Sequence, residues 1–340
     1  MGLNSKIIIG FLIALALIAG LEFNFEGGAL MYCMLFFVAI SMGPIAIVAA
    51  VDIAGSQWIK PYKKILLSTR HMILLIPFLF IVFWASGKLH LYGWTEHETG
   101  WLNQNFFVLR NVLVLLFAWV MANKFASVSL NDAPGKVKWG VLWELTYVVT
   151  QTLVAVDWVM SLDYPWISTL FGAYFFVEAF YSGLALAAII TFFKYQSFND
   201  QFPKTFKNSQ MDMMTMMFGF SIFWAYQFFS QYLVIWYGNI PEEVAFLVHR
   251  LEIYSNLMYL VLISLFVIPF ITMLSRKVKG NPVADLVLGI LVLSGILLER
   301  FFMIAPHMTL NPVITIVEFL VLAVLFVMVL RTSEAAEVTS

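Results

Sequence analysis

The sequence predicts an all-α polytopic membrane protein, because its composition and the spacing of its apolar residues both call for lipid as the solvent. Of the 340 residues, 62% are hydrophobic and 11% are charged, whereas a soluble domain carries about 25% charged residues. The apolar residues gather in ten long runs separated by short polar gaps. A large soluble core would still need a charged surface, so we expect most of the chain to lie within a bilayer.

The ten runs reach or approach the roughly 20 residues that a helix needs to cross hydrocarbon. They cover residues 7–23, 29–51, 71–87, 105–126, 139–162, 168–193, 211–237, 244–272, 283–304 and 312–330. The first run follows Lys6 and resembles a signal peptide, but no small-x-small cleavage site comes after it. Cleavage would leave nine spans. We expect one membrane domain over residues 1–331 and a short, disordered cytoplasmic tail over residues 332–340.

The basic residues are concentrated in every second gap, which predicts an orientation. Fifteen of the 19 lie on one side of the predicted membrane: Lys6, Lys60, Lys63, Lys64, Arg70, Lys124, Lys136, Lys138, Lys194, Lys204, Lys207, Arg276, Lys277, Lys279 and Arg331. Lys88 is the one basic residue in a loop on the other side. Because cytoplasmic loops carry the excess of lysine and arginine, we expect the first side and both termini to be cytoplasmic.

Two of the predicted spans begin alike. The span that opens at residue 105 carries Arg110 near its start, and the span that opens at residue 244 carries Arg250 at a similar place. An offset of four spans preserves the direction of crossing, as in parallel repeats related about the membrane normal. This similarity between two span starts therefore suggests two parallel four-helix bundles, at about residues 29–162 and 168–304.

Charged residues inside the predicted spans are the candidates for function, since a carboxylate at the centre of a membrane helix costs about 2.5–3.5 kcal/mol on insertion scales. Buried carboxylates that exchange protons with water form proton routes. The candidates for a proton pathway are Glu144, Asp157, Glu178, Asp212 and Glu252, and their candidate charge partners are Arg110, His249 and Arg250.

The position of each candidate decides how strongly it argues for function. Glu178 lies close to mid-membrane, and Glu144 lies in the cytoplasmic half of its span. Asp157 and Asp212 lie near the interfaces, where charged groups at helix ends are common. Glu252 beside Arg250 fits either a structural pair or an outer proton gate.

The sequence offers little to hold a metal or a haem. Cys33 is the single cysteine, so the chain cannot supply a disulfide framework or a cysteine-ligated iron–sulfur cluster. The five histidines lie in predicted loops and span ends, which is a poor arrangement for two axial haem ligands. We therefore expect no cofactor bound covalently or through a metal ligand. The net charge of −1 gives no reason to expect nucleic acid as a partner, whereas the lipid bilayer is one.

Two segments resemble a known family. The first is Val156–Asp163 (VDWVMSLD), which continues through Trp166–Gly172 (WISTLFG). The second comprises Phe223–Tyr226 (FWAY), Phe229–Tyr232 (FSQY) and Ile235–Glu243 (IWYGNIPEE). Both are similar to ActF, a large membrane subunit of alternative complex III, the bacterial quinol:cytochrome c oxidoreductase. ActF is in turn similar to the NrfD and polysulfide-reductase membrane subunits. The likeness is clearest over about residues 100–260.

The resemblance implies two four-helix bundles flanked by peripheral helices, in a multi-pass protein of the bacterial cytoplasmic (inner) membrane. It implies a sister NrfD-like membrane subunit with the better quinol site, an iron–sulfur subunit, and multihaem or monohaem cytochrome c subunits on the outer face. This chain would be a non-haem subunit, not catalytic alone, that provides a proton pathway, part of a quinone-proximal site, or both. The quinone would be menaquinone or ubiquinone. The region before the second span is shorter than in the family members, which leaves the subunit composition open.

Two other functions stay open. One is a proton-coupled secondary transporter in which Glu178 and Arg250 bind substrate or a coupling ion. Transporters tend to carry paired Gly and Pro interruptions in corresponding helices, whereas the interruptions here are scattered. The other is a structural membrane anchor for peripheral redox subunits.

Overall fold

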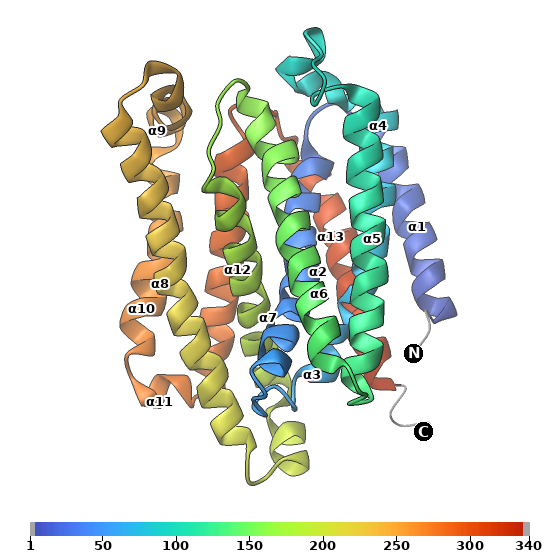
Figure 1. The fold of residues 1–340 in the computed structure, drawn as a ribbon, viewed down its shortest axis with the longest axis vertical. Coiled ribbons are helices and arrows are strands. Elements are labelled where there is room, and N and C mark those ends of the chain that lie inside the picture. The colour runs from blue at the N-terminus through green and yellow to red at the C-terminus, as the bar shows by residue number, and fades with distance from the viewer. Residues whose placement is uncertain (1–3, 336–340) are drawn as a thin grey trace.

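The computed structural model describes residues 4–335, which fold into helices of α, 3₁₀ and π type with no strand among them (Figure 1). The elements are α1 (Ser5–Glu22), α2 (Ala29–Ile53), α3 (Lys63–Ser68), α4 (Arg70–Ala85), η1 (Lys88–Leu91), η2 (Gly93–Glu96), α5 (Gln104–Leu130), α6 (Lys136–Leu153), η3 (Val154–Val159), η4 (Met160–Asp163), α7 (Phe171–Gln201), α8 (Phe206–Gly238), α9 (Pro241–Leu262), η5 (Ile263–Val267), α10 (Ile268–Met273), α11 (Arg276–Lys279), α12 (Pro282–Ile304) and α13 (Pro312–Ala335). The predicted all-α class of a polytopic membrane protein is confirmed.

Nine segments of the described chain are long and apolar enough to cross a membrane. They correspond to nine of the ten predicted spans. The remaining prediction, residues 211–237, lies within α8, a helix of 33 residues that runs alongside the other long helices (Figure 1). This helix is long enough to cross, but glutamines such as Gln227 and Gln231 make it less apolar than the other nine.

Two predicted boundaries change in the structure. The third span begins before residue 71, because α3 leads at Thr69 directly into α4 and buries Ile65, Leu66 and Leu67. At the other end of the chain, α13 continues to Ala335. Residues 332–335 are therefore helical and not part of a disordered tail, while residues 336–340 of the predicted tail lie outside the described residues.

The long helices group into two rings of four. Around the first ring α2 contacts α4, α4 contacts α5, α5 contacts α6 and α6 contacts α2, whereas α7, α8, α9 and α12 close the second ring in the same way. The rings meet where α2 and α6 pack on α7. The helices α1 and α13 contact each other and the first ring from outside. The first ring falls within residues 29–162 and the second ring within residues 168–304, the ranges of the two bundles suggested by the similar starts of two predicted spans.

Small residues let α2 and α7 approach closely where the two rings meet. A Cβ atom at Gly43 would lie 1.8 Å from the carbonyl oxygen of Ala179, and one at Gly183 would lie 2.7 Å from the backbone nitrogen of Pro44. Membrane helices commonly use small residues for such contacts, because packing rather than hydrophobic burial drives their association. The junction of the rings therefore has no room for a larger side chain at Gly43.

The two ends of the molecule differ in charge. One end carries α3, α11 and the turn between α5 and α6, and both the start of α1 and the end of α13 lie there (Figure 1). We call it the basic end, because the clusters Lys60–Lys64, Lys136–Lys138 and Arg276–Lys279 belong to it. The opposite end carries residues 86–103, 164–170 and 305–311. That the basic end faces the cytoplasm stays a prediction.

Candidate functional site

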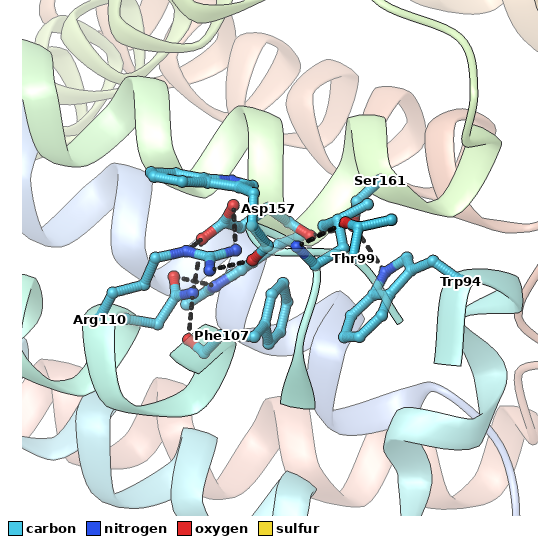
Figure 2. A network of polar contacts seen from close by, with 10 residues as sticks. Trp94, Thr99, Phe107, Arg110, Asp157 and Ser161 are labelled. Carbon is cyan, nitrogen blue, oxygen red and sulfur yellow. Dashed lines mark hydrogen bonds and ion pairs between the residues drawn. The ribbon is translucent and has the colours of Figure 1, made fainter. Parts of the chain in front are cut away.

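Asp157 is fully buried and forms a two-pronged ion pair with Arg110 (Figure 2). Arg110 Nε lies 2.7 Å from Asp157 Oδ2, and Arg110 Nη2 lies 2.9 Å from Asp157 Oδ1. The helix α5 carries the arginine, and the π-helical turn η3 at the end of α6 carries the aspartate. Arg110 is thus a charge partner, as expected from the sequence, and its carboxylate is Asp157.

Neighbouring side chains satisfy the other polar atoms around this pair. Asn111 Nδ2 donates to Asp157 at 2.7 Å, and Asn111 Oδ1 accepts from Trp158 Nε1 at 2.8 Å. Burial raises the pKa of the Tyr92 phenol well above its usual value, so this hydroxyl stays protonated and donates to the Trp158 carbonyl at 3.0 Å. A carboxylate held by so many fixed donors has little freedom to exchange protons. The geometry therefore favours a structural role for Asp157.

Arg250 makes the same kind of pair with Asp163, six residues after Asp157. Arg250 Nη1 lies 3.0 Å from Asp163 Oδ1, and Arg250 Nη2 lies 2.7 Å from Asp163 Oδ2. His307 Nε2 lies 2.8 Å from the same carboxylate. The arginine is fully buried, whereas 10% of the Asp163 side chain and 25% of the His307 side chain are exposed. This cluster therefore reaches the surface at the end opposite the basic end.

Two predicted participants, His249 and Glu252, lie outside this cluster. Both side chains are exposed on α9, and Arg250 bonds to Asp163 instead of Glu252. The expectation of a Glu252–Arg250 pair was wrong because residues two apart on a helix point in different directions. His249 packs edge-to-face on His307, with 6.4 Å between ring centres, and it is His307 that contacts the carboxylate.

Charged side chains also meet deep inside the second ring. Arg300 Nη2 lies 2.8 Å from Glu178 Oε2, and neither side chain has exposed surface. The hydroxyl of Tyr174 donates to Glu299, and Trp224 Nε1 lies 3.4 Å from the other Glu299 oxygen. We call Glu178, Arg300, Glu299 and Tyr174 the central cluster. Of these four residues, only Glu178 was a candidate from the sequence, because it was chosen by its estimated depth in a predicted span.

The central cluster lies closer to the opposite end of the molecule than to the middle of the helices. Glu178 is seven residues after Phe171, the first residue of α7, which places it about 10 Å along that helix. Arg300 also stacks over the ring of Phe175, with 3.8 Å from the guanidinium carbon to the ring centre. Glu178 therefore lies in the half of α7 nearer the opposite end, and its position close to mid-membrane stays a prediction.

Glu144 lies between the basic end and the central cluster. It is half-buried on α6, and its buried Oε1 atom accepts no hydrogen bond within the described residues. Tyr147, one turn further along α6, interacts electrostatically with both Glu144 and Glu178. Its hydroxyl donates to the carbonyl of Phe176 on α7. Tyr147 therefore interacts electrostatically with the two carboxylates that the sequence placed deepest, while its hydroxyl donates to the backbone of α7 and to neither carboxylate.

At the basic end, the buried carboxylate is not the one that was chosen from the sequence. Asp212 is exposed on α8, so its carboxylate does not reach the interior and it is a helix-end group. The buried carboxylate there is Asp285, near the start of α12, which accepts from Gln210 Nε2 at 2.7 Å. Sequence reasoning could not separate the two, because both aspartates lie at predicted helix ends.

A small cavity of about 50 Å³ adjoins the central cluster. Tyr174, Glu299 and Gln231 line it together with apolar side chains of α7, α8, α9 and α12. The side-chain surface that faces this cavity is apolar, so its size alone does not make it a site for water. Gln231 accepts from Ser168 Oγ at 2.7 Å, and Ser168 belongs to the 164–170 segment. The cavity therefore leads from the central cluster toward the opposite end.

Lys88, the exception to the charge pattern, is buried and not exposed in a loop. Its Nζ atom lies 2.9 Å from Glu22 Oε1 at the end of α1. Glu318 of α13 is also fully buried and interacts with the Glu22 carboxyl. This pairing was missed from the sequence, although a single basic residue on the acidic side of the membrane was a signal that it needed a partner.

No family model matches this chain, and no curated protein matches it. Within residues 4–335, no group of three or more His, Cys, Asp or Glu side chains is arranged to hold a metal ion. Fold and site together therefore define a class, an all-α polytopic membrane protein with ionisable clusters in its interior.

Proposed function

We propose that this chain is a proton-conducting membrane subunit of a quinol:cytochrome c oxidoreductase similar to alternative complex III. The segments Val156–Gly172 and Phe223–Glu243, which resemble ActF, support the proposal. The two rings of four helices with α1 and α13 outside them agree with the fold that this resemblance implies. The protein would lie in a bacterial cytoplasmic membrane with its basic end facing the cytoplasm.

The charge balance of the central cluster is the observation that carries this proposal. Arg300 forms an ion pair with Glu178 and also interacts electrostatically with Glu299, in a region with almost no exposed surface. An uncompensated buried charge is costly, so a neutral cluster holds one proton on its two carboxyls. Two carboxyls with one proton between them form a group that can accept a proton from one side and release it on the other.

The first half of the route would run from the basic end to the central cluster. Glu144 is half-buried and takes protons from the cytoplasmic side. The Tyr147 hydroxyl interacts electrostatically with both Glu144 and Glu178, and it would pass a proton between the two carboxyls by leaving the Phe176 carbonyl to which it now donates. Hydroxyl groups both donate and accept hydrogen bonds, so they can pass a proton along a chain.

The second half would run from the central cluster to the opposite end. Glu299 accepts from the Tyr174 hydroxyl, and both residues line the cavity that also contacts Gln231. From Glu299 the proton would leave toward the Gln231–Ser168 pair, which lies nearer the opposite end. The route crosses the membrane without a metal or haem ligand from this chain.

Quinol oxidation is placed in the sister NrfD-like subunit and not beside the central cluster. A cavity of about 50 Å³ is well below the 300–1,000 Å³ typical of small-molecule sites. The iron–sulfur and cytochrome c subunits would dock on the opposite end, which faces away from the cytoplasm. The transporter hypothesis has less support, because its two expected ligands for substrate or ion, Glu178 and Arg250, are already paired with Arg300 and Asp163.

The proposal is tested by purifying the tagged chain from its native membranes in mild detergent. We expect it to bring iron–sulfur and cytochrome c subunits, identified by mass spectrometry, with a c-type haem band in the reduced-minus-oxidised spectrum. The membranes must be shown to retain another respiratory complex intact. A colourless, solitary protein from such membranes would overturn the proposal and make a transporter the better hypothesis.

A further inference from the structure

A groove lies on the side of the molecule between α13 and the pair α7 and α12. Its volume is about 730 Å³. The floor is formed by buried residues of α2, among them Phe36 and Ile40, and the rims by exposed residues such as Ile290 of α12 and Val327 of α13. It forms because α13 packs mainly on α1, α2 and α3.

The groove has the depth of one leaflet of a bilayer. Along α13 it extends from Phe319 to Arg331, which is about 18 Å at 1.5 Å per residue. Half of a hydrocarbon core of about 30 Å is about 15 Å. The apolar part of the groove therefore spans the leaflet at the basic end.

Two cations mark the end of the groove that lies at the basic end. Lys194 of α7 and Arg331 of α13 both line it, while almost all its other lining residues are apolar. Basic pockets between membrane helices on the cytoplasmic side are typical sites for anionic lipid head groups. Arginine and lysine both hold phosphate oxygens through charge-assisted hydrogen bonds.

We propose that this groove binds one anionic phospholipid, with an acyl chain along α13 and the phosphate at Lys194 and Arg331. The basic residues at one end of an otherwise apolar groove favour a lipid with an anionic head group over an apolar helix of a partner subunit. A quinone tail would fit the apolar part, but a quinone head group is neutral, whereas a lipid phosphate is complementary in charge to the basic end of the groove.

The test uses the full chain, delipidated in mild detergent and examined by native mass spectrometry. Phosphatidylglycerol and phosphatidylcholine are added in separate titrations. Wild-type protein should bind phosphatidylglycerol more tightly. Lys194→Gln and Arg331→Gln should each weaken that binding about fivefold and leave phosphatidylcholine binding unchanged. As a matched control, Lys204→Gln/Lys207→Gln removes two exposed lysines at the same end of the molecule, outside the groove, and should change neither affinity.

A second variant tests the apolar part of the site. Ala323→Trp places a large ring in the groove, so it should abolish the binding of both lipids while circular dichroism shows unchanged helix content. Equal affinity of wild-type protein for the two lipids would overturn the proposal. So would phosphatidylglycerol binding that is unaffected by Ala323→Trp. Displacement of phosphatidylglycerol by menaquinone, equally in wild-type and charge-substituted protein, would show that the site is one for a quinone tail.

Discussion

Arg110 and Arg250 belong to different rings of helices, yet both pair with carboxylates of one short segment. Arg110 holds Asp157 in η3, and Arg250 holds Asp163 at the end of η4. The π turn η3 interrupts the regular helix at Asp157. Such π turns within helices are frequent at functional sites. Residues 157–163 therefore tie the two rings together at the end opposite the basic end.

Breaking the first of these pairs should destabilise the protein strongly. Asp157→Asn keeps the shape of the side chain but leaves the buried Arg110 charge without its counter-ion. Such a change costs about 3–5 kcal/mol. We expect a loss of this size in the free energy of unfolding, measured by denaturant titration in mixed micelles. The exposed Glu252 provides the control, because Glu252→Gln should alter stability by about 0.5 kcal/mol or less.

A double variant separates charge compensation from packing. In Arg110→Met/Asp157→Leu both charges are replaced by apolar side chains of similar size, which is often neutral or stabilising for a buried pair. We therefore expect this variant to recover most of the stability lost in Asp157→Asn. A double variant no more stable than the single one would show that hydrogen bonds to Asn111 and the backbone, and not the ion pair, hold the segment.

Lys88 should matter for stability although the sequence places it in a loop. Lys88→Met removes the cation of a buried pair and leaves the Glu22 carboxyl beside Glu318 in an apolar setting. The expected loss is again about 3–5 kcal/mol, and Lys88→Met/Glu22→Gln should regain much of it. The matched control is Lys204→Met, which alters an exposed lysine. Similar unfolding midpoints for Lys88→Met and Lys204→Met would contradict the burial of Lys88.

The junction between the rings should not accept even one methyl group. In Gly43→Ala the new Cβ would lie 1.8 Å from a backbone oxygen of α7, so the helices must separate. We expect a loss of about 3 kcal/mol, at the upper end of overpacking effects. Gly20→Ala is the control, since no atom lies within 4 Å of its Cβ and alanine favours helix by up to about 1 kcal/mol. Equal stability of the two variants would refute the close contact.

Hydropathy alone was sufficient to predict most of the fold. Nine predicted spans recur because each apolar run is long enough to force a helix in lipid, where every backbone polar group must be satisfied within the segment. The prediction failed at span boundaries, because burial decides them. Lys63 and Lys64 read as loop residues, but α3 begins at Lys63 and turns three apolar side chains inward.

The candidate site was only partly predictable, because depth along a helix is visible in the sequence whereas direction around it is not. Glu178 and Glu144 were found by depth. Asp212 and Glu252 were at suitable positions but point outward. Glu299 and Arg300 are adjacent in the chain, yet their partners, Tyr174 and Glu178, lie on another helix. Such pairings require the arrangement of the helices, which no periodicity gives.

Glu178→Gln tests whether the central cluster carries protons. The substitution keeps the size of the side chain but removes one of the two carboxyls that interact with Arg300, so the cluster loses its exchangeable proton. Positioned proton-transfer groups contribute about 10²–10⁴-fold to a rate. In proteoliposomes containing the complex proposed above, proton translocation per quinol oxidised should therefore fall by at least about tenfold, while quinol oxidation in detergent falls much less. Glu252→Gln should leave both unchanged. A wild-type proton yield from Glu178→Gln, in a complex with all its subunits, would remove Glu178 from the route and leave the cluster a structural role.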